Sequence, residues 1–487
     1  MAYNRGKFDI MGGASDEPSY IYYNCDIINN RTDDVTQALQ AQPDPQIRFN
    51  ETRDTALVRD ASQYEFSIIR FTMNGANRDL PLFIPNIATG QSNVNLTNYA
   101  CAISYQQSWN TNLGVTTFNI TPLPTFVIFT PEVLNPVLAP TPRPPTVEQD
   151  ISTRYYWVNT YQHWIDIVNQ TLLQAHQALF ADFQLAWAGT AGLTDPFPYA
   201  TFADFQANVN TPQIVYGDEV KPLFTLYGDS DGYGLRLEPF TPIPYVAGTA
   251  SPQTQPRERL FFNTNLAGLF ANFSSVYWNR TDIGSNTIGG VTYPAFPNPV
   301  PEGYVREIIF PNKFYQNVED FRLAPFSGIP PLGYVPLAQQ KVYWKLLQDF
   351  KSVDSLWSPI SSIVFTTSLL PIKTESASAP NILGTSNLGD SAPTSKSAFQ
   401  PIITDISLDT ALSGADDYRQ FIYYAPNAEY RMSDLSSSKQ EIRNIDVSVF
   451  WKNRLNNELY PVQMYNLSSV SIKMMFRHKR VGRAKID

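Results

Sequence analysis

The stretch Asn159-Thr-Tyr-Gln-His-Trp-Ile-Asp-Ile-Val-Asn-Gln-Thr-Leu-Leu-Gln-Ala-His-Gln-Ala-Leu-Phe-Ala-Asp-Phe-Gln-Leu-Ala-Trp187 stands out in a chain that otherwise consists of strand-like segments and proline-punctuated loops. Its apolar residues recur with the period of one wide helix face. They are Tyr161, Trp164, Ile165, Val168, Leu172, Ala175, Leu179 and Phe183. We predict a long amphipathic helix over residues 160–188, with Asn159 as N-cap, Gln162 as its reciprocal partner and Gly189 as the C-terminal stop.

The surroundings of this helix point to a sheet. The run Tyr155–Val158 is dense in β-formers, which predicts a strand leading directly into the helix. A helix that is so apolar on one face is not stable alone in water and must pack on other structure. We therefore expect Trp164, Val168, Leu172 and Phe183 to be buried against β structure.

Polar groups on the helix do not form a recognisable site. His163 and His176 are 13 residues apart, which is not the spacing of a helical metal pair, and Asp166 and Asp182 are too distant for paired carboxylates. The aromatic stripe could line a ligand pocket, but at helical spacing such a stripe is far more typical of a core. We expect no metal and no cofactor.

Composition indicates a mainly β protein. Of 487 residues only 16% are charged, whereas 13% are aromatic and 38 are proline. Aromatic side chains suit pleated sheets, and prolines occupy loops and sheet edges. The low charge also suggests that part of the exterior meets other protein.

Cys25 and Cys101 have neither metal-ligand nor disulfide-framework spacing, and we interpret them as buried thiols. The N-terminus has no apolar signal segment, and no run approaches the length of about 18 apolar residues that a membrane span needs. We expect a protein made in a reducing, intracellular setting, without a membrane span.

Charge is distributed unevenly. The net charge of −9 argues against a general nucleic-acid binder, but residues 473–487 form a basic tail. Its cations are Lys473, Arg477, Lys479, Arg480, Arg483 and Lys485. Such a cluster could neutralise phosphates non-specifically or pair with an acidic neighbour, and it could also be a solvated terminus.

The remaining chain is a succession of candidate strands. Residues 1–45 form an N-terminal arm or edge segment that contains the strand Tyr20–Ile28. Tyr64–Met73 and Ile363–Ile372 are apolar on both faces, whereas Ile445–Trp451 and Ser468–Phe476 alternate as half-buried strands do. Residues 373–399 are rich in Ser, Ala, Asn, Thr, Gly and Pro, which predicts an exposed loop.

One motif resembles a catalytic signature. Gly228–Gly232 matches Gly-x-Ser-x-Gly around Ser230, but the following segment alternates like a strand, so the motif predicts a hairpin turn rather than a hydrolase elbow. A calcium loop through Asp229, Asp231 and Glu238 would have Tyr227 at its first ligand position and no flanking helices. We therefore do not expect an enzyme.

Several strand patterns together resemble the penton or minor capsid proteins of polinton-like viruses, adintoviruses and virophages. They span most of the chain, in order from Ile47 to Arg480. They are Arg48-Phe-Asn-Glu-Thr-Arg-Asp54, Tyr64-Glu-Phe-Ser-Ile-Ile-Arg-Phe71, Leu82-Phe-Ile-Pro85, Tyr155-Tyr-Trp-Val158, Tyr161-Gln-His-Trp-Ile-Asp-Ile-Val-Asn169, Ser362-Ile-Val-Phe-Thr-Thr-Ser-Leu-Leu-Pro371, Ala428-Glu-Tyr-Arg431, Ile445-Asp-Val-Ser-Val-Phe-Trp-Lys452 and Ser471-Ile-Lys-Met-Met-Phe-Arg477.

The resemblance implies a single jelly-roll sandwich with insertions, assembled as a homopentamer at the five-fold vertices of an icosahedral double-stranded DNA virus. Major capsid protein would surround it, packaged DNA would lie at its inner face, and a host receptor or glycan could meet its outer face. It would reside in the virion capsid after assembly in the host cytoplasm or nucleus. Two alternatives stay open: another capsid protein of the same particle, or a β-sandwich module that recognises host glycans.

From these patterns we expect jelly-roll strands in residues 46–135 and 400–480. Residues 146–372 would form an insertion or upper region that carries the helix and could include further jelly-roll strands.

Overall fold

The structure is a computed structural model. It describes residues 18–30, 46–75, 79–88, 91–132, 154–209, 211–217, 223–228, 242–254, 256–271, 273–279, 286–288, 291–293, 304–308, 314–315, 343–347, 357–373, 401–407, 421–425, 432–435, 438–455, 457–465 and 467–479. The chain divides into two compact units, residues 1–81 with 359–487 (unit 1) and residues 82–358 (unit 2). No helix within the described ranges is long and apolar enough to cross a membrane.

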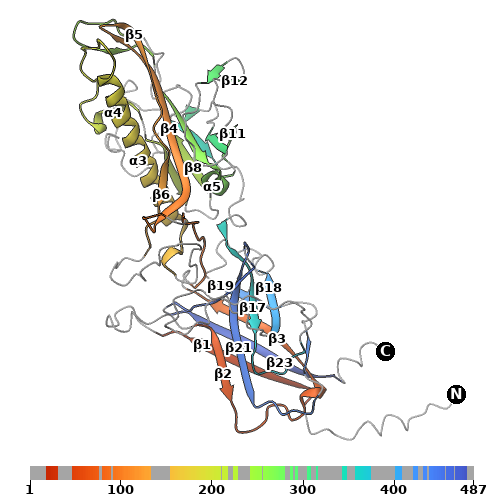
Figure 1. The fold of residues 1–487 in the computed structure, drawn as a ribbon. Coiled ribbons are helices and arrows are strands. Elements are labelled where there is room, and N and C mark those ends of the chain that lie inside the picture. The colour runs from red at the N-terminus through yellow and green to blue at the C-terminus, as the bar shows by residue number, and fades with distance from the viewer. Residues whose placement is uncertain are drawn as a thin grey trace, which may run out of the picture. The chain divides into compact units, whose positions relative to one another are not determined.

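Unit 1 consists of two antiparallel sheets (Figure 1). The first sheet has the order β1 (Tyr20–Ile28), β23 (Ser469–His478), β3 (Tyr64–Asn74), β19 (Phe421–Tyr424), with β20 (Ser433–Asp434) also paired to β3. The second has the order β18 (Ile402–Ser407), β17 (Ile360–Thr366), β21 (Asn444–Asn453), β2 (Arg48–Thr52), with β22 (Leu459–Pro461) paired to β21. A short 3₁₀ helix, Ala61–Gln63, precedes β3.

The connectivity of unit 1 follows the order of an eight-stranded jelly roll. Leaving aside the short β20 and β22, the chain visits β1, β2, β3, β17, β18, β19, β21 and β23, and all but one of the connections cross between the two sheets. This produces the interleaved strand order of two Greek keys. The rings of Phe71 on β3 and Phe365 on β17 meet at 5.0 Å, so the two sheets share a core. In the sequence, unit 2 is an insertion between strands β3 and β17 of unit 1.

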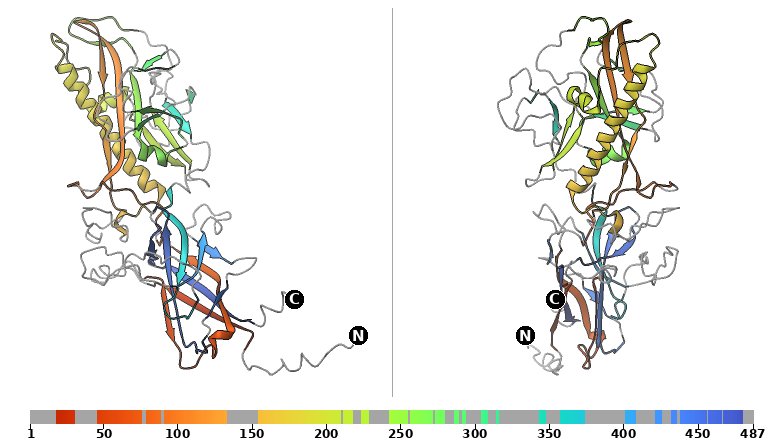
Figure 2. Two further views of the ribbon diagram at one scale, coloured as in Figure 1. Left: turned by 45° about the vertical axis from the view of Figure 1, so that its right-hand side comes forward. Right: turned by 90° about the vertical axis from the view of Figure 1, so that its left-hand side faces the viewer.

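Unit 2 contains a seven-stranded sheet, a four-stranded sheet and one long helix (Figure 2). The larger sheet has the order β11 (Ser275–Asn279), β14 (Tyr304–Ile308), β10 (Arg257–Asn263), β4 (Leu96–Thr111), β5 (Gly114–Ile120), with β6 (Thr125–Ile128) and β9 (Ser251–Pro252) also paired to β4. The smaller has the order β15 (Phe314–Tyr315), β16 (Tyr343–Leu347), β8 (Leu223–Gly228), β7 (Gln213–Gly217). A hairpin, β12 (Asn286–Ile288) with β13 (Val291–Tyr293), stands apart from both. The helical segments are the 3₁₀ turn Arg154–Tyr156, α3 (Tyr161–Ala188), α4 (Phe202–Asn208) and α5 (Thr264–Leu269).

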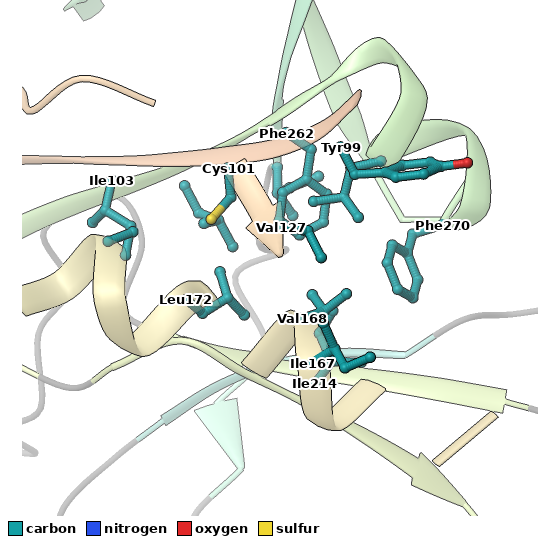
Figure 3. Close-up of a cluster of buried hydrophobic side chains, with 14 of the residues drawn as sticks. Tyr99, Cys101, Ile103, Val127, Ile167, Val168, Leu172, Ile214, Phe262 and Phe270 are labelled. Atoms are coloured by element: carbon teal, nitrogen blue, oxygen red, sulfur yellow. The ribbon is translucent and has the colours of Figure 1, made fainter. Parts of the chain in front are cut away.

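The long helix α3 is built into the core of unit 2. Trp164, Val168, Leu172 and Phe183 are fully buried. The ring of Trp164 packs edge-on against Phe83 and Tyr99, and Phe183 packs against Tyr105 and Phe118. Figure 3 shows Val168 and Leu172 in a cluster with residues of β4 and β6. Each fully buried side chain of this size stabilises the fold by roughly 1.5–3 kcal/mol.

The entry to α3 differs from the expectation. Thr160, not Asn159, is the N-cap: its backbone is extended and its hydroxyl accepts from the His163 N–H at 3.3 Å. Asn159 is engaged elsewhere, because its side chain donates to the Glu132 carboxylate at 2.9 Å. The expected strand at 155–158 is a 3₁₀ turn followed by an isolated bridge between Val158 and Phe83. At the other end Gly189 is the C-cap, as predicted.

The unit boundaries also differ from the expected ones. Residues 82–135 belong to unit 2, because β4 pairs with β5, β6, β9 and β10. Residues 360–366 belong to unit 1, because β17 pairs with β18 and β21, and the expectation for residues 146–372 had left room for such a further strand. The expected mainly β class is confirmed, and β1 is an edge strand. The predicted loop at 373–399, beyond Lys373, and the motif around Ser230 lie outside the described residues.

Candidate assembly surfaces

The first sheet of unit 1 presents exposed aromatic pairs at both of its edges. Tyr20 and Tyr22 stack in parallel on β1, and Phe421 and Tyr423 stack in parallel on β19. Residues two apart share a face of a strand, so each pair points to the solvent side while Cys25 and Ile422 point into the core. Tyr22 is 55% exposed and Tyr423 is 52% exposed, so both edges have aromatic surface available to a partner.

The described cations of the basic tail are all matched within unit 1. The ammonium of Lys473 lies 5.0 Å from the ring centre of Tyr22. Arg477 forms an ion pair with Glu65 on β3 at 2.7 Å, and Lys479 forms one with Asp434 on β20 at 3.4 Å. Pairs as accessible as these typically contribute about 0.2–1 kcal/mol each. The cations on β23 therefore tie neighbouring strands together, whereas Arg480, Arg483 and Lys485 lie outside the described residues.

A buried carboxylate organises the turn that follows β17. Asp446 on β21 is 2% exposed. It accepts from the hydroxyl of Thr367, from the N–H and hydroxyl of Ser368, both at 2.7 Å, and from the N–H of Leu369 at 2.9 Å. Burial raises the pKa of the Asp446 carboxyl, but these hydrogen bonds outweigh it and hold the pKa below its usual value. The sequence does not reveal this site, because Asp446 looks like any polar residue on the solvent side of an alternating strand.

His176 lies in the core of unit 2 rather than in a pocket. It is completely buried, and its Nδ1 is 2.8 Å from the hydroxyl of Thr211. The carboxylate of Glu258 is 3.6 Å from Nε2, which is beyond hydrogen-bonding distance. Burial lowers the pKa of His176 to about 3, so the imidazole is neutral near pH 7. His163 is part of the helix entry, where its Nε2 lies 2.7 Å from the carbonyl oxygen of Thr130.

Neither cysteine has the character of a reactive thiol. Cys25 and Cys101 are free and buried, and burial raises the pKa of each thiol to about 12. Within the described ranges, no group of His, Cys, Asp and Glu could hold a metal ion.

The end of unit 2 where β4 turns into β5 is braced by Asp195. Its carboxylate accepts from the N–H of Asn112 at 2.6 Å and from the hydroxyl of Tyr245 at 2.9 Å. Its carbonyl accepts from the indole of Trp187 at 2.9 Å. Aliphatic side chains are exposed on this braced end, among them Leu113, Val115 and Val246. Rigid loops with exposed apolar groups are suited to binding another surface.

One solved structure shares this fold over nearly the whole chain. No curated protein gives a significant match. A chain of the Sputnik virophage, from its cryo-EM structure, is 19% identical, with a TM-score of 0.58 over 96% of this chain and 99% of that one. The crystal structure of the mavirus penton protein is 13% identical, with a TM-score of 0.44 over 94% of this chain and 99% of that one. The family model described as Sputnik minor capsid protein V18/19 matches residues 21–478, and the chain therefore belongs to this family of minor capsid proteins.

Proposed function

We propose that this protein is a penton, a structural component of the virion whose five copies close each five-fold vertex of an icosahedral capsid. Membership of a minor capsid protein family supports a role in the virion shell. The jelly-roll connectivity of unit 1 supports a rigid wall element, and the insertion of unit 2 between β3 and β17 supports a second part with a separate task. Major capsid protein would be its neighbour at the vertex.

The observation that carries the pentamer is the pair of aromatic edges on one sheet. A closed ring of identical copies needs head-to-tail contacts, so each copy must offer two different surfaces. β1 with Tyr20 and Tyr22 forms one edge of the sheet, and β19 with Phe421 and Tyr423 forms the other. Aromatic side chains are enriched where protein interfaces are strongest. A ring in which the β19 edge of one copy meets the β1 edge of the next uses both.

Two measurements test this proposal. Native mass spectrometry of the purified protein should give an assembly with five times the 54.9 kDa mass of one chain. Cryo-EM of purified particles should show density for the chain at the vertices. A protein that is monomeric at every concentration, or one that is absent from particles, would refute the proposal.

The basic end supports a further part of this proposal, contact with packaged DNA at the inner face. Since Lys473, Arg477 and Lys479 are matched within unit 1, the contact would depend chiefly on Arg480, Arg483 and Lys485. Each phosphate contact that a cation makes releases counterions, so binding should weaken as salt rises.

The braced end of unit 2 favours a second candidate function, recognition of a host receptor or glycan. Leu113 and Val115 are exposed on a hairpin whose turn is fixed through Asn112 and Asp195. Glycan-array binding and host-cell binding by the purified protein should be lost on changing both residues to Ser. If neither assay detects binding by the unaltered protein, this function is excluded and the structural role stands alone.

A further inference from the structure

The outer face of α3 has an unusual composition for a helix in contact with water. Its exposed positions form one continuous strip, which we call the α3 strip, and half of them are glutamine. They are Gln162, Asp166, Gln170, Leu173, Gln174, Gln177, Ala181, Gln184, Leu185 and Ala188. At 100° per residue these positions cover about 140° of the helix circumference. Asp166 is the one charged residue among them.

A permanently solvated helix surface would look different. A soluble surface is designed with about 25–35% Lys, Arg, Glu and Asp, and oppositely charged pairs four residues apart stabilise a solvated helix. Residues 155–220 contain no Lys or Arg at all. The amide, alanine and leucine side chains of the α3 strip cost less to remove from water than charged groups would. The strip therefore has the chemistry of a surface that becomes covered.

The strip is not the packing face of the helix within its own unit. That opposite face holds Trp164, Val168, Leu172 and Phe183 and already contacts β4, β5 and β6. On one flank, Asn169 is also in place, because its side-chain amide exchanges two 2.8 Å hydrogen bonds with the backbone of Ile214 on β7. Figure 2 shows α3 running along the side of unit 2.

The chemistry of the strip identifies its partner. A glutamine amide is both a donor and an acceptor, so a row of glutamines can hydrogen-bond to an identical row. A strip with so little charge also allows two copies of an acidic chain to approach without strong like-charge repulsion along the helix. A charged partner of either sign would find almost no opposite charge there. We propose that the α3 strip packs against the α3 strip of a second copy of this chain.

This inference rests on the proposed pentamer and adds a contact between neighbouring copies in unit 2. In a ring each copy meets two neighbours, so the two flanks of the strip would each face one of them. A helix of 28 residues is about 42 Å long. With a width of about 10 Å, the strip offers on the order of 400 Å², so each flank offers about 200 Å², a quarter of the roughly 800 Å² per partner in a stable interface. The contact should thus strengthen a ring that other surfaces also hold.

The direct test places acidic charges on the strip. The triple variant Gln170→Glu, Gln174→Glu, Gln177→Glu should raise the dissociation constant between copies at least tenfold, measured by sedimentation velocity and native mass spectrometry. The loss should be smaller in 0.5 M salt, since screening shortens the range of repulsion to about 4–5 Å. The control is the double variant Thr117→Glu, Asn119→Glu. These exposed β5 positions alternate with Phe118, which packs on α3, so they lie on the opposite face of the sheet. The control should assemble as the unaltered protein does.

A second measurement does not depend on how the charged variant folds. A benzophenone amino acid at Leu173, introduced into the full chain, should cross-link to residues 161–188 of another copy in the assembled protein. Mixing ¹⁴N- and ¹⁵N-labelled chains distinguishes copies in the mass spectrum.

Unchanged association of a folded triple variant, or cross-links that map only elsewhere, would overturn the inference and leave the pentamer intact. Failure of the unaltered protein to form any oligomer would instead refute the proposed function and this inference with it.

Discussion

Asp446 provides the sharpest test of how unit 1 is held together. Changing it to Asn keeps its shape but replaces a carboxylate oxygen with an NH₂ group. At least one of the donors on Thr367, Ser368 and Leu369 then faces another donor in a buried site. A hydrogen bond to a charged group contributes about 1.5–3 kcal/mol, and an unsatisfied buried donor costs about 1–3 kcal/mol. We expect the variant to lose about 2–4 kcal/mol of the unfolding free energy of unit 1.

The pH dependence of the unfolding free energy tests the role of Asp446 independently. The pKa of Asp446 is lower in the folded chain than in the unfolded chain, so its contribution is present above the ordinary carboxyl pKa and is lost as pH falls through the folded value. Asparagine does not titrate. The stability difference between the unaltered protein and the Asp446→Asn variant should therefore be constant above about pH 5 and shrink below about pH 4.

The assay must separate the two units. Urea unfolding followed by pulsed hydrogen exchange and mass spectrometry does so, because peptides from β17 and β21 report unit 1 and peptides from α3 report unit 2. The midpoint should fall for β17 and β21 and stay unchanged for α3. Asp26→Asn, at an exposed position on β1, is the control and should change neither. A loss below about 0.5 kcal/mol, the usual range of surface changes, or a difference that does not vary with pH would refute the reasoning.

Three further predictions concern the helix core, a buried histidine and the basic end. Phe183→Ala should destabilise unit 2 by about 3–5 kcal/mol in the same exchange assay. Leu185→Ala, at a 70% exposed position, should change the unfolding free energy by no more than about 0.5 kcal/mol. Equal effects of the two substitutions would contradict the packing of α3. Burial lowers the pKa of His176 to about 3, so between about pH 6.5 and 3 the unfolded chain takes up a proton that the folded chain does not. Unit 2 should therefore lose unfolding free energy as pH falls through that range. A His176→Leu variant whose unfolding free energy falls as steeply with pH would count against this. Changing Arg480, Arg483 and Lys485 to Gln should reduce the salt-dependent retention of DNA in particles. Arg477→Gln should mainly remove the ion pair with Glu65 and leave DNA retention unchanged. DNA retention that is insensitive to the triple change would favour a solvated tail.

Local features were predictable from the sequence because they depend on neighbouring residues. The strand Tyr20–Ile28 has the predicted bounds, and the long helix begins and ends within one residue of the predicted 160–188. The side-chain period of each segment sets these features. The N-cap shows the limit of this reasoning. Asn159 and Thr160 are both good capping residues. Which of them caps the helix depends on Glu132, a residue distant in the chain that accepts a hydrogen bond from the Asn159 side chain.

The assembly surfaces were less predictable, although part of the signal was there. Alternation in Tyr20–Ile28 places Tyr20 and Tyr22 on one face, but only the topology shows that β1 and β19 are opposite edges of one sheet. The cations of the tail were visible as a cluster, whereas their partners Glu65 and Asp434 come from other strands. Charge content alone could not show which of these cations join neighbouring strands.

The mainly β class, the amphipathic helix with its buried face and the capsid-protein resemblance all follow from the amino-acid order alone, since each is expressed in local periodicity and strand patterns. The folded chain was needed to show that β4 belongs with the helix in unit 2 and that β17 belongs with β21 in unit 1. Strand pairing is a long-range property: β1 pairs with β23, from Tyr20 with Arg477 to Ile28 with Ser469, across nearly the whole chain. An alternating segment has the same pattern whichever sheet it joins, so its partner is chosen by the core that the complete fold can bury.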